Sequence, residues 1–156
     1  MRFFRISNAA FSTPSAAFSG IGASKADHRW SWGRSTTRAV YCSDTLSLAC
    51  LECLVHIRPL PRLFIPSVYY VIDIPETQLE KPPLSKLPGG WDATLATAAT
   101  RDFGSRFLEE QRAVGLVVPT AILPEGLNVL INPLHPHFQL SWVKGPLVFK
   151  FDTRLG

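Results

Sequence analysis

One stretch constrains the fold more than any other, residues 38 to 57, RAVYCSDTLSLACLECLVHI. It begins as a short strand, Arg38 to Cys42, and then reaches Ser43 and Asp44, whose short side-chain oxygens suit a helix N-cap. The residues that follow are apolar on nearly every helical face, and their main stripe is Leu46, Cys50, Cys53, Leu54 and Ile57. Because a helix that is apolar all round is normally buried, the stretch predicts a strand followed by a buried helix.

A single carboxylate, Glu52, interrupts this helix. No lysine or arginine stands three or four positions away to pair with it. Burying an unpaired carboxylate is costly, so the group reaches a polar cleft, finds a distant partner or takes up a proton. Two interpretations stay open: Glu52 lies on an exposed strip of the helix, or the helix presents one acid to a pocket.

The composition limits the class of protein. A chain of 156 residues, 46% apolar and 18% charged, is long enough for one domain with its own core. Its thirteen prolines favour short strands and ordered loops over long helices. A net charge of +4 is too small for the dense basic stripe of a nucleic-acid binder, whereas scattered arginines suit a phosphate-bearing small molecule.

Three cysteines do not suggest a secreted disulfide scaffold. Cys50 and Cys53 form a CxxC inside the helix, not at its N-terminus, where redox motifs lower a thiol pKa, so both are interpreted as small core residues. Zinc would need two further ligands and only His56 is near, so no metal site is predicted. No apolar run approaches the roughly 20 residues of a membrane span, and we expect a cytoplasmic protein.

The rest of the chain alternates short strands with loops. Strands are predicted at residues 3–6, 67–74, 115–119, 128–131 and 146–154, and a helix within 93–113. Residues 7–37 and 75–92 are predicted to be loops, and Pro59 and Pro61 to end the central helix. Trp30 and Trp32, with neighbouring arginines, indicate either a functional loop or core anchors. The sum is one α+β domain, residues 1–156, with about six strands and two main helices.

Seven polar residues are candidates for chemistry: Arg5, Arg29, Tyr41, Glu52, Thr120, Asn132 and His135. No nucleophile elbow and no Walker-type phosphate loop occurs in the sequence. Asn132 and His135 are interpreted as braces of a loop through backbone hydrogen bonds, with metal ligation as the alternative. A carboxylate, arginines, a tyrosine and a hydroxyl suit a reaction in which a cation forms beside an anionic ligand.

These residues lie within motifs that resemble the RES-domain family, named for its Arg, Glu and Ser residues. The resemblance runs nearly from end to end, and its ordered set is more specific than any single motif. Its pieces are Phe4 to Ile6, FSGIGA (Phe18 to Ala23), His28 to Trp30 with Gly33, Val40 to Ser43, Leu48 to His56, Val117 to Ala121, Asn128 to Pro136 and Phe151 to Arg154.

The resemblance implies a fold similar to ADP-ribosyltransferase toxins, with small central β-sheets and flanking helices. It also implies degradation of NAD⁺ as substrate, by phosphorolysis or hydrolysis of the nicotinamide–ribose bond, with inorganic phosphate as a possible co-substrate and no cofactor or metal. By resemblance, Arg29 with Arg5 anchors the NAD⁺ diphosphate and Tyr41 contacts the nicotinamide ribose. Glu52 stabilises the oxocarbenium ion, and Thr120, in place of the family serine, bonds a substrate or phosphate oxygen.

Further expectations follow from the same resemblance. The first 26 residues are rich in serine and free of acids, as in a transit peptide, but the match places Arg5 inside the fold. Family toxins pair with a cognate Xre-type antitoxin that carries a DNA-binding domain, and a homodimer is typical. Asp27, His28 and Ser31 depart from the family pattern. Two alternatives therefore stay open, a protein ADP-ribosyltransferase using the same site and a catalytically weakened binding module.

Overall fold

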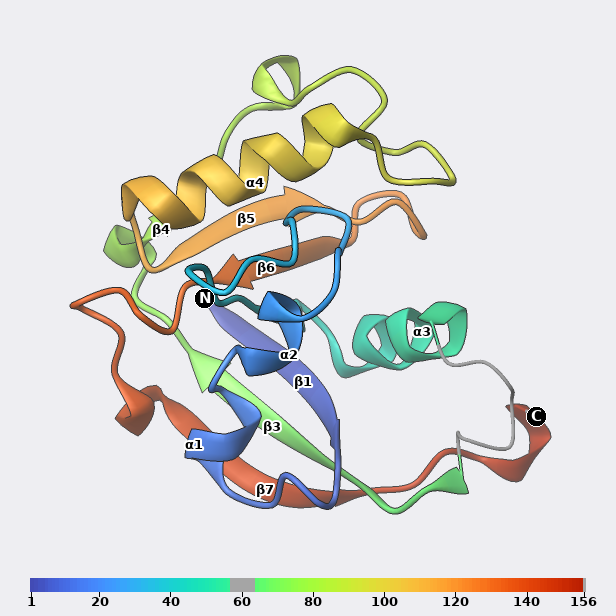
Figure 1. The fold of residues 1–156 in the computed structure, drawn as a ribbon. Helices are drawn as coiled ribbons and strands as arrows, with labels where there is room; N and C mark the ends of the chain where they lie inside the picture. Colours follow the sequence, from blue (N-terminus) through green and yellow to red (C-terminus); the bar gives the residue numbers. More distant parts are fainter. Residues whose placement is uncertain (57–63, 156) are drawn as a thin grey trace.

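The computed structural model describes residues 1–56 and 64–155, which form one α+β unit around a seven-stranded sheet (Figure 1). The sheet order is β4-β5-β6-β2-β1-β3-β7, and β4–β5 is its parallel pair. The strands are β1 (Arg2–Asn8), β2 (Val40–Ser43), β3 (Ser67–Asp73), β4 (Leu79–Glu80), β5 (Gly115–Pro119), β6 (Leu127–Ile131) and β7 (Val143–Phe149). The predicted α+β class is confirmed, with seven strands joined in one sheet where about six in small sheets were expected.

Two long helices, α3 (Leu46–His56) and α4 (Ala98–Glu110), are those that the sequence predicts. The predicted loop over residues 7–37 is wrong in part, because it contains the short helices α1 (Pro14–Ala17) and α2 (Ile21–Ser24). In Figure 1, α4 lies alongside β5, whereas α1 and α2 lie beside β1 and β3. Thr13 caps α1, with Pro14 at the first helical position, where its missing N–H costs nothing.

The N-cap of helix α3 lies one residue after Asp44, the later of the two predicted caps. The N–H of Leu48 donates to Thr45 Oγ1 at 3.0 Å, so Thr45 is the N-cap, and the prediction of Ser43 or Asp44 is wrong. Ser43 remains in β2, and the N–H of Asp44 donates to the carbonyl of Leu127 at 2.9 Å. Antiparallel pairing with β6 therefore holds those two residues in the sheet. The predicted helix end at Ile57, with Pro59 and Pro61, lies outside the described residues.

The expectation that α3 is buried on every face is also wrong in part. Leu48 and Ala49 are buried, whereas Val55, near the C-terminal end, is 53% exposed. The first turns therefore anchor the helix against the sheet, and the later turns face a cavity and solvent. This arrangement leaves room for a polar group on the helix.

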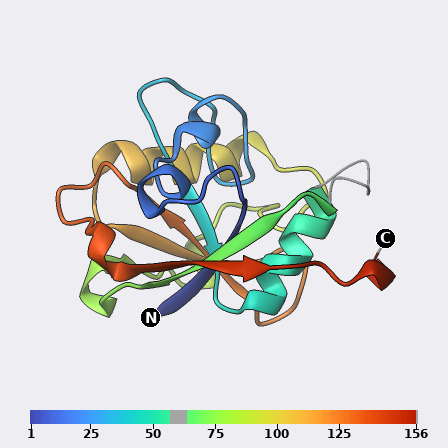
Figure 2. The same cartoon turned by 90° about the horizontal axis from the view of Figure 1, so that it is seen from below.

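The sheet changes direction between β1 and β2. Strands β1 and β3 are paired along their whole length, but β1 and β2 pair only at Phe4 and Ser43 in the described chain. Beyond that point the two strands separate, and the sheet divides into β1-β3-β7 and β4-β5-β6-β2. Figure 2 shows the resulting crossing of the strands. A division of this kind opens a space lined by both strands.

Trp30 fixes the long N-terminal connection against α4. Its side chain is 2% exposed and packs against Trp91 and Phe103, with ring centroids 6.4 and 6.1 Å apart. A Cβ at Gly104 would lie 1.7 Å from the Trp30 carbonyl oxygen, so only glycine permits this approach. Trp30 is therefore a core anchor, one of the two interpretations offered by the sequence. The half-buried Trp32 instead donates its indole N–H to Asp102 at 2.6 Å.

The described residues also bear on two other classes of protein, membrane-spanning and metal-binding. Across residues 1–56 and 64–155, no helix is both long enough and apolar enough to cross a membrane. The same residues contain no group of three His, Cys, Asp or Glu side chains placed to hold a metal ion.

Candidate active site

A cavity of about 560 Å³ lies where β1 and β2 separate. Its wall includes Phe4 to Ile6 of β1 and Tyr41 to Ser43 of β2. The remaining wall comes from α3, the segments around residues 22–30 and 119–122, Thr94 and Asn128. Five of the seven predicted site residues line this cavity: Arg5, Arg29, Tyr41, Glu52 and Thr120.

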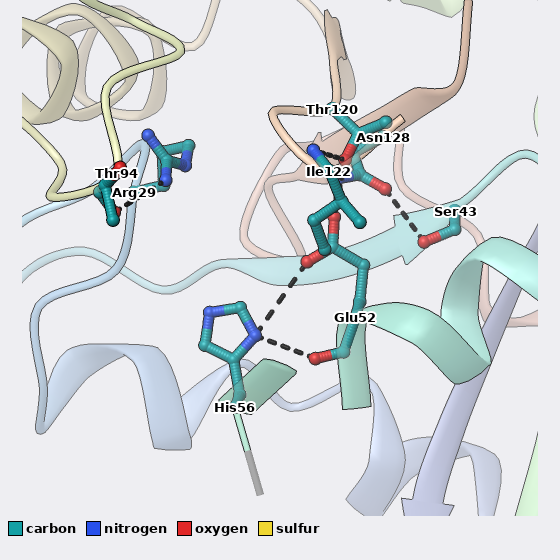
Figure 3. A network of polar contacts seen from close by, with 8 residues as sticks. All are labelled: Arg29, Ser43, Glu52, His56, Thr94, Thr120, Ile122 and Asn128. Atoms are coloured by element: carbon teal, nitrogen blue, oxygen red, sulfur yellow. Dashed lines mark hydrogen bonds and ion pairs between the residues drawn. The ribbon is translucent and has the colours of Figure 1, made fainter. Parts of the chain in front are cut away.

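Glu52 is the centre of a hydrogen-bonded carboxylate network, defined here as Glu52, Thr120, Asn128 and Ser43 (Figure 3). Its Oε1 accepts from the Thr120 hydroxyl at 2.9 Å and from the Asn128 amide at 2.6 Å. The Asn128 oxygen in turn accepts from the Ser43 hydroxyl at 2.8 Å, which fixes the direction of the amide. Glu52 thus reaches a polar cavity and finds distant partners, as one of its two interpretations requires.

The elements explain how these four residues meet. Ser43 and Asn128 are directly opposed in the antiparallel pair of β2 and β6. Thr120 follows β5, and its N–H donates to the Gly126 carbonyl at 3.0 Å across the connection to β6. Helix α3 then places Glu52 over the ends of both strands. The carboxylate accordingly receives two neutral donors from the sheet.

A histidine, His56, lies close to Glu52, although no lysine or arginine stands three or four positions away. Its Nδ1 lies 3.8 Å from Glu52 Oε2 and 2.7 Å from the main-chain oxygen of Glu52, one helical turn earlier. The imidazole is 71% exposed, whereas the Glu52 side chain is 25% exposed. Glu52 therefore has a titratable partner on its own helix, at the edge of the cavity.

Arg5 occupies the gap between the separating strands. Its Nη1 donates to the main-chain oxygen of Tyr41 at 3.0 Å, an oxygen close to where the β1–β2 ladder ends. Its Nε is buried and has no hydrogen-bond partner within the part of the chain that the structure describes. The ion pairs among the described residues do not include Arg5. A guanidinium with a free donor and no counter-charge therefore borders the cavity.

Arg29 is bonded to the protein itself. Its Nη1 donates to the main-chain oxygens of Trp91 and Ala93 at 2.9 and 2.8 Å, and its Nη2 donates more weakly to Thr94 at 3.4 Å. Figure 3 shows Arg29 beside Thr94, apart from Glu52. These bonds hold the 91–94 segment, including the cavity-lining Thr94, against the loop before β2. Arg29 therefore positions the cavity wall, with Nε and part of Nη2 left for a ligand.

Tyr41 is held by two residues that depart from the family pattern. Its hydroxyl lies 2.6 Å from the hydroxyl of the buried Ser31. Its ring packs against the imidazole of His28, with centroids 5.2 Å apart and planes at 38°. Burial raises the pKa of the Tyr41 hydroxyl well above its usual range, so the group stays neutral. Tyr41 can therefore donate a hydrogen bond but carries no charge.

Asn132 and His135 lie away from the cavity. Asn132 is buried, donates to the Leu108 carbonyl at 3.2 Å and accepts from the N–H of Leu134 at 3.0 Å. His135 Nε2 lies 3.1 Å from the Gln111 carbonyl oxygen. The interpretation of both as loop braces is confirmed. Asp27 is exposed, accepts from the N–H of Gly33 and does not line the cavity.

Sequence reasoning missed four residues that the structure brings to the site. They are His28, Ser31, His56 and Asn128. Asn128 had one signal, since it is the polar residue in the otherwise apolar strand LNVLI. His56 also had one, since it stands four positions after Glu52 on the same helix. His28 and Ser31 are separated in sequence from Tyr41, which they contact, and local pattern carries no information about that.

Comparisons with known proteins agree with this fold and motif order. A solved chain of the M. tuberculosis MbcT–MbcA toxin–antitoxin complex superposes with a TM-score of 0.72, over 96% of this chain and 84% of that one, at 14% identity. The fold is thus of the same α+β class as that chain. The RES domain family model matches residues 2–152, and the chain belongs to this family.

Curated relatives extend the comparison. A "Toxin Res" of Photorhabdus laumondii is 38% identical over 90% of this chain and 88% of its own length. A "Toxin Res" of Yersinia enterocolitica is 35% identical over 90% and 91% of the two chains. A protein of a Sphingobium strain, named "Prs ADP-ribosylating toxin", is 36% identical over 86% of this chain and 83% of its own length.

Proposed function

We propose that this chain is the toxin of a toxin–antitoxin pair and that it cleaves the nicotinamide–ribose bond of NAD⁺. The ADP-ribosyl group is transferred to inorganic phosphate or to water, and the loss of NAD⁺ arrests growth. The carboxylate network carries the proposal, because it holds Glu52 in one orientation at the wall of a cavity that also presents the unpaired guanidinium of Arg5.

The proposed reaction requires a carboxylate that is fixed beside the bond that breaks. As the C1′–N bond breaks, its electron pair passes to the nicotinamide ring, which leaves as a neutral base, and the ribose becomes an oxocarbenium ion. A fixed carboxylate stabilises that cation and needs no reorganisation during the reaction. A phosphate oxygen or water then forms the new bond to C1′. When water attacks, its proton is released.

The other side chains have distinct parts in this proposal. Arg5 binds the diphosphate through Nε and its second amino group, and Arg29 completes the contact while it holds the wall. Tyr41, kept neutral, contacts the nicotinamide ribose. Thr120 and Asn128 keep Glu52 aimed by donating to one of its oxygens.

Purified protein incubated with NAD⁺, with and without inorganic phosphate, tests the proposal by mass spectrometry of the products. Nicotinamide with a phosphorylated ADP-ribose formed only with phosphate identifies a phosphorylase. Free ADP-ribose under both conditions identifies a glycohydrolase. The Glu52→Gln protein, prepared in parallel, controls for contaminating activity. Intact NAD⁺ with the folded wild-type protein contradicts the proposal and favours a weakened binding module.

A second candidate is transfer of ADP-ribose to a protein, because the Sphingobium relative is named an ADP-ribosylating toxin. The same carboxylate and cavity would serve, with a protein side chain as the acceptor. NAD⁺ labelled in the adenosine part distinguishes the two reactions in a lysate. Label that becomes acid-precipitable with protein favours this candidate, whereas label that stays in small molecules favours the first.

The proposal extends to partners. The solved neighbour is a toxin–antitoxin complex, which supports a cognate antitoxin, of the Xre type with a DNA-binding domain, that covers the cavity entrance. We also propose self-association as a homodimer. Co-expression with the protein encoded beside it, followed by light scattering of the purified complex, measures both. A monomer that does not bind that protein contradicts this part.

A further inference from the structure

Arg5 and His28, named here the cationic pair, both line the cavity and both carry side-chain nitrogens without a hydrogen-bond partner among the described residues. Arg5 uses one amino group on the Tyr41 carbonyl, while its buried Nε has no acceptor. A buried donor without a partner is costly and is rare in folded proteins. A ligand oxygen in the cavity would satisfy it and neutralise part of the guanidinium charge.

His28 presents its imidazole to the same cavity. The hydrogen bonds that it makes among the described residues use the main chain: its N–H donates to the Ser31 carbonyl at 2.9 Å, and its carbonyl accepts from Arg101 at 3.0 Å. The ring is half-buried, packs on Tyr41 and lines the cavity. Its main chain is thus fixed, and its ring nitrogens remain open to a ligand.

Burial and nearby charges lower the pKa of the His28 ring when the cavity is empty. Burial is the main reason that the His28 pKa lies below its usual value, and the positive charges of His56 on α3, Arg5 on β1 and Arg101 on α4 add to it. Asp27, on the same loop as His28, opposes this. The Tyr41 hydroxyl on β2 is neutral and contributes no charge. An anion bound between these groups would reverse the balance.

We propose that Arg5 and His28 form a proton-linked subsite for a phosphate-like oxyanion, in which the imidazole of His28 takes up one proton from solvent as the anion binds. The inference rests on the proposed function for the identity of its ligand, the diphosphate of NAD⁺. An anion beside His28 favours the protonated ring, because opposite charges at close range stabilise the ionised form. The ring then donates a charge-assisted hydrogen bond where it was idle before.

The affinity of this subsite for an anion should depend on pH. The His28 pKa is lowered in the free protein and higher in the proposed complex, so binding consumes a proton and the affinity rises as pH falls between the two pKa values. Uptake of one proton allows at most about a tenfold change in affinity per pH unit. We expect the dissociation constant for ADP-ribose to fall about three- to tenfold from pH 8 to pH 6. The diphosphate itself lacks the second ionisation near pH 6 of a monoester.

Two-dimensional NMR of the imidazole signals tests the proposal directly, since the chain has four histidines. His28 is titrated without ligand, with ADP-ribose and with sulfate, whose charge is constant over this range. Both ligands should move the His28 titration to higher pH, and the exposed His137, outside the cavity, should not respond. An unchanged His28 titration in saturated complexes overturns the proposal.

Calorimetry with variants separates this inference from the proposed function. Wild-type protein and the control His137→Gln should take up protons on binding ADP-ribose, measured in buffers of different ionisation enthalpy, and His28→Gln should not. ADP-ribose that binds with no proton uptake overturns the subsite and leaves the proposed function standing. Sulfate that shifts His28 while ADP-ribose fails to bind supports the oxyanion subsite and contradicts the proposed function. If neither ligand binds, both are overturned.

Discussion

The carboxylate network and the cationic pair share one cavity but differ in how complete they are. The donors that face Glu52 are engaged within the protein: Thr120 and Asn128 donate to one carboxylate oxygen, and Ser43 orients the Asn128 amide. Arg5, by contrast, keeps a buried Nε with no acceptor, and the ring of His28 lacks a bonding partner among the described residues. The donors of the carboxylate network are therefore bonded without a ligand, whereas the cationic pair keeps nitrogens without a partner.

This difference matches the two tasks of an ADP-ribosyl transfer site. A group that stabilises a transient cation must be oriented before the reaction, because reorganisation during the reaction would cost barrier height. A group that binds a substrate anion gains most when its donors are still free. In the proposed reaction the two parts therefore serve catalysis and binding respectively, and substitutions in them should affect different kinetic constants.

Glu52→Gln should have the largest effect. It removes the negative charge and keeps the shape, so we expect turnover of NAD⁺ to fall by about 10²–10³-fold, the cost typical of a lost electrostatic stabiliser. The Michaelis constant should change little, because the loss falls on the transition state. Glu76→Gln, at an exposed carboxylate outside the cavity, is the matched control. Near-normal turnover in folded Glu52→Gln would remove Glu52 from catalysis.

Arg5→Gln should act on binding. Loss of a charge-assisted contact costs roughly 1.5–3 kcal/mol, so we expect the Michaelis constant for NAD⁺ to rise about 10- to 100-fold with turnover reduced less. Arg2→Gln is the control, because Arg2 lies on the same strand but is exposed and paired with Asp73. Steady-state kinetics measure both constants. A variant that loses turnover alone would break the assignment of Arg5 to the substrate-binding part.

Thr120→Val should have a smaller effect, about tenfold on turnover. Valine matches the shape of threonine but removes the donor to Glu52 and the acceptor for the Ile122 N–H, at an expected cost of about 1–2 kcal/mol in the free energy of unfolding. Thr120→Ser keeps the hydroxyl and should retain most activity. Urea denaturation and steady-state rates measure the two effects. Equal activity of the valine and serine variants would show that Thr120 does not aim Glu52.

Much of this fold was predictable from local pattern, and the failures have identifiable causes. Strand β5 follows from its continuous apolar run, and helix α4 from its helical spacing, since the burial of each matches its pattern. The N-cap of α3 was mispredicted because Ser43, Asp44 and Thr45 are three consecutive cap-forming residues. Pairing of β2 with β6 engages the first two and leaves Thr45. Pairing between distant strands, which residue propensities do not describe, therefore determines which of the three residues caps the helix.

The same distinction between local pattern and tertiary contact applies to the residues of the site. That a buried Glu52 needs a polar cleft or a distant partner follows from the cost of burying its charge, and a pocket was one of the two interpretations that the sequence left open. That the donors are Thr120 and Asn128, 68 and 76 positions away, depends on the turn between β5 and β6 and on the packing of α3. The resemblance to the family supplied Thr120, and no local signal supplied the contact of Asn128 or the orientation of His28.

Cys53 can report on both parts of the cavity, with the smallest expected effect. Its pKa is raised to about 11, mainly by burial and then by Cys50; Arg5 lowers it and the Glu52 charge raises it. The thiolate is the reactive form, so labelling by iodoacetamide should be about 100-fold slower at pH 8 than for a free cysteine and rise about tenfold per pH unit towards pH 10. Glu52→Gln should then speed labelling of Cys53 by about twofold, and Arg5→Gln should slow it by about twofold. Mass spectrometry of the labelled peptide separates Cys53 from the more exposed Cys50. Shifts of the same sign in both variants would mean that Cys53 senses a change in packing, and the opposition of the two charges across the cavity would lose its support.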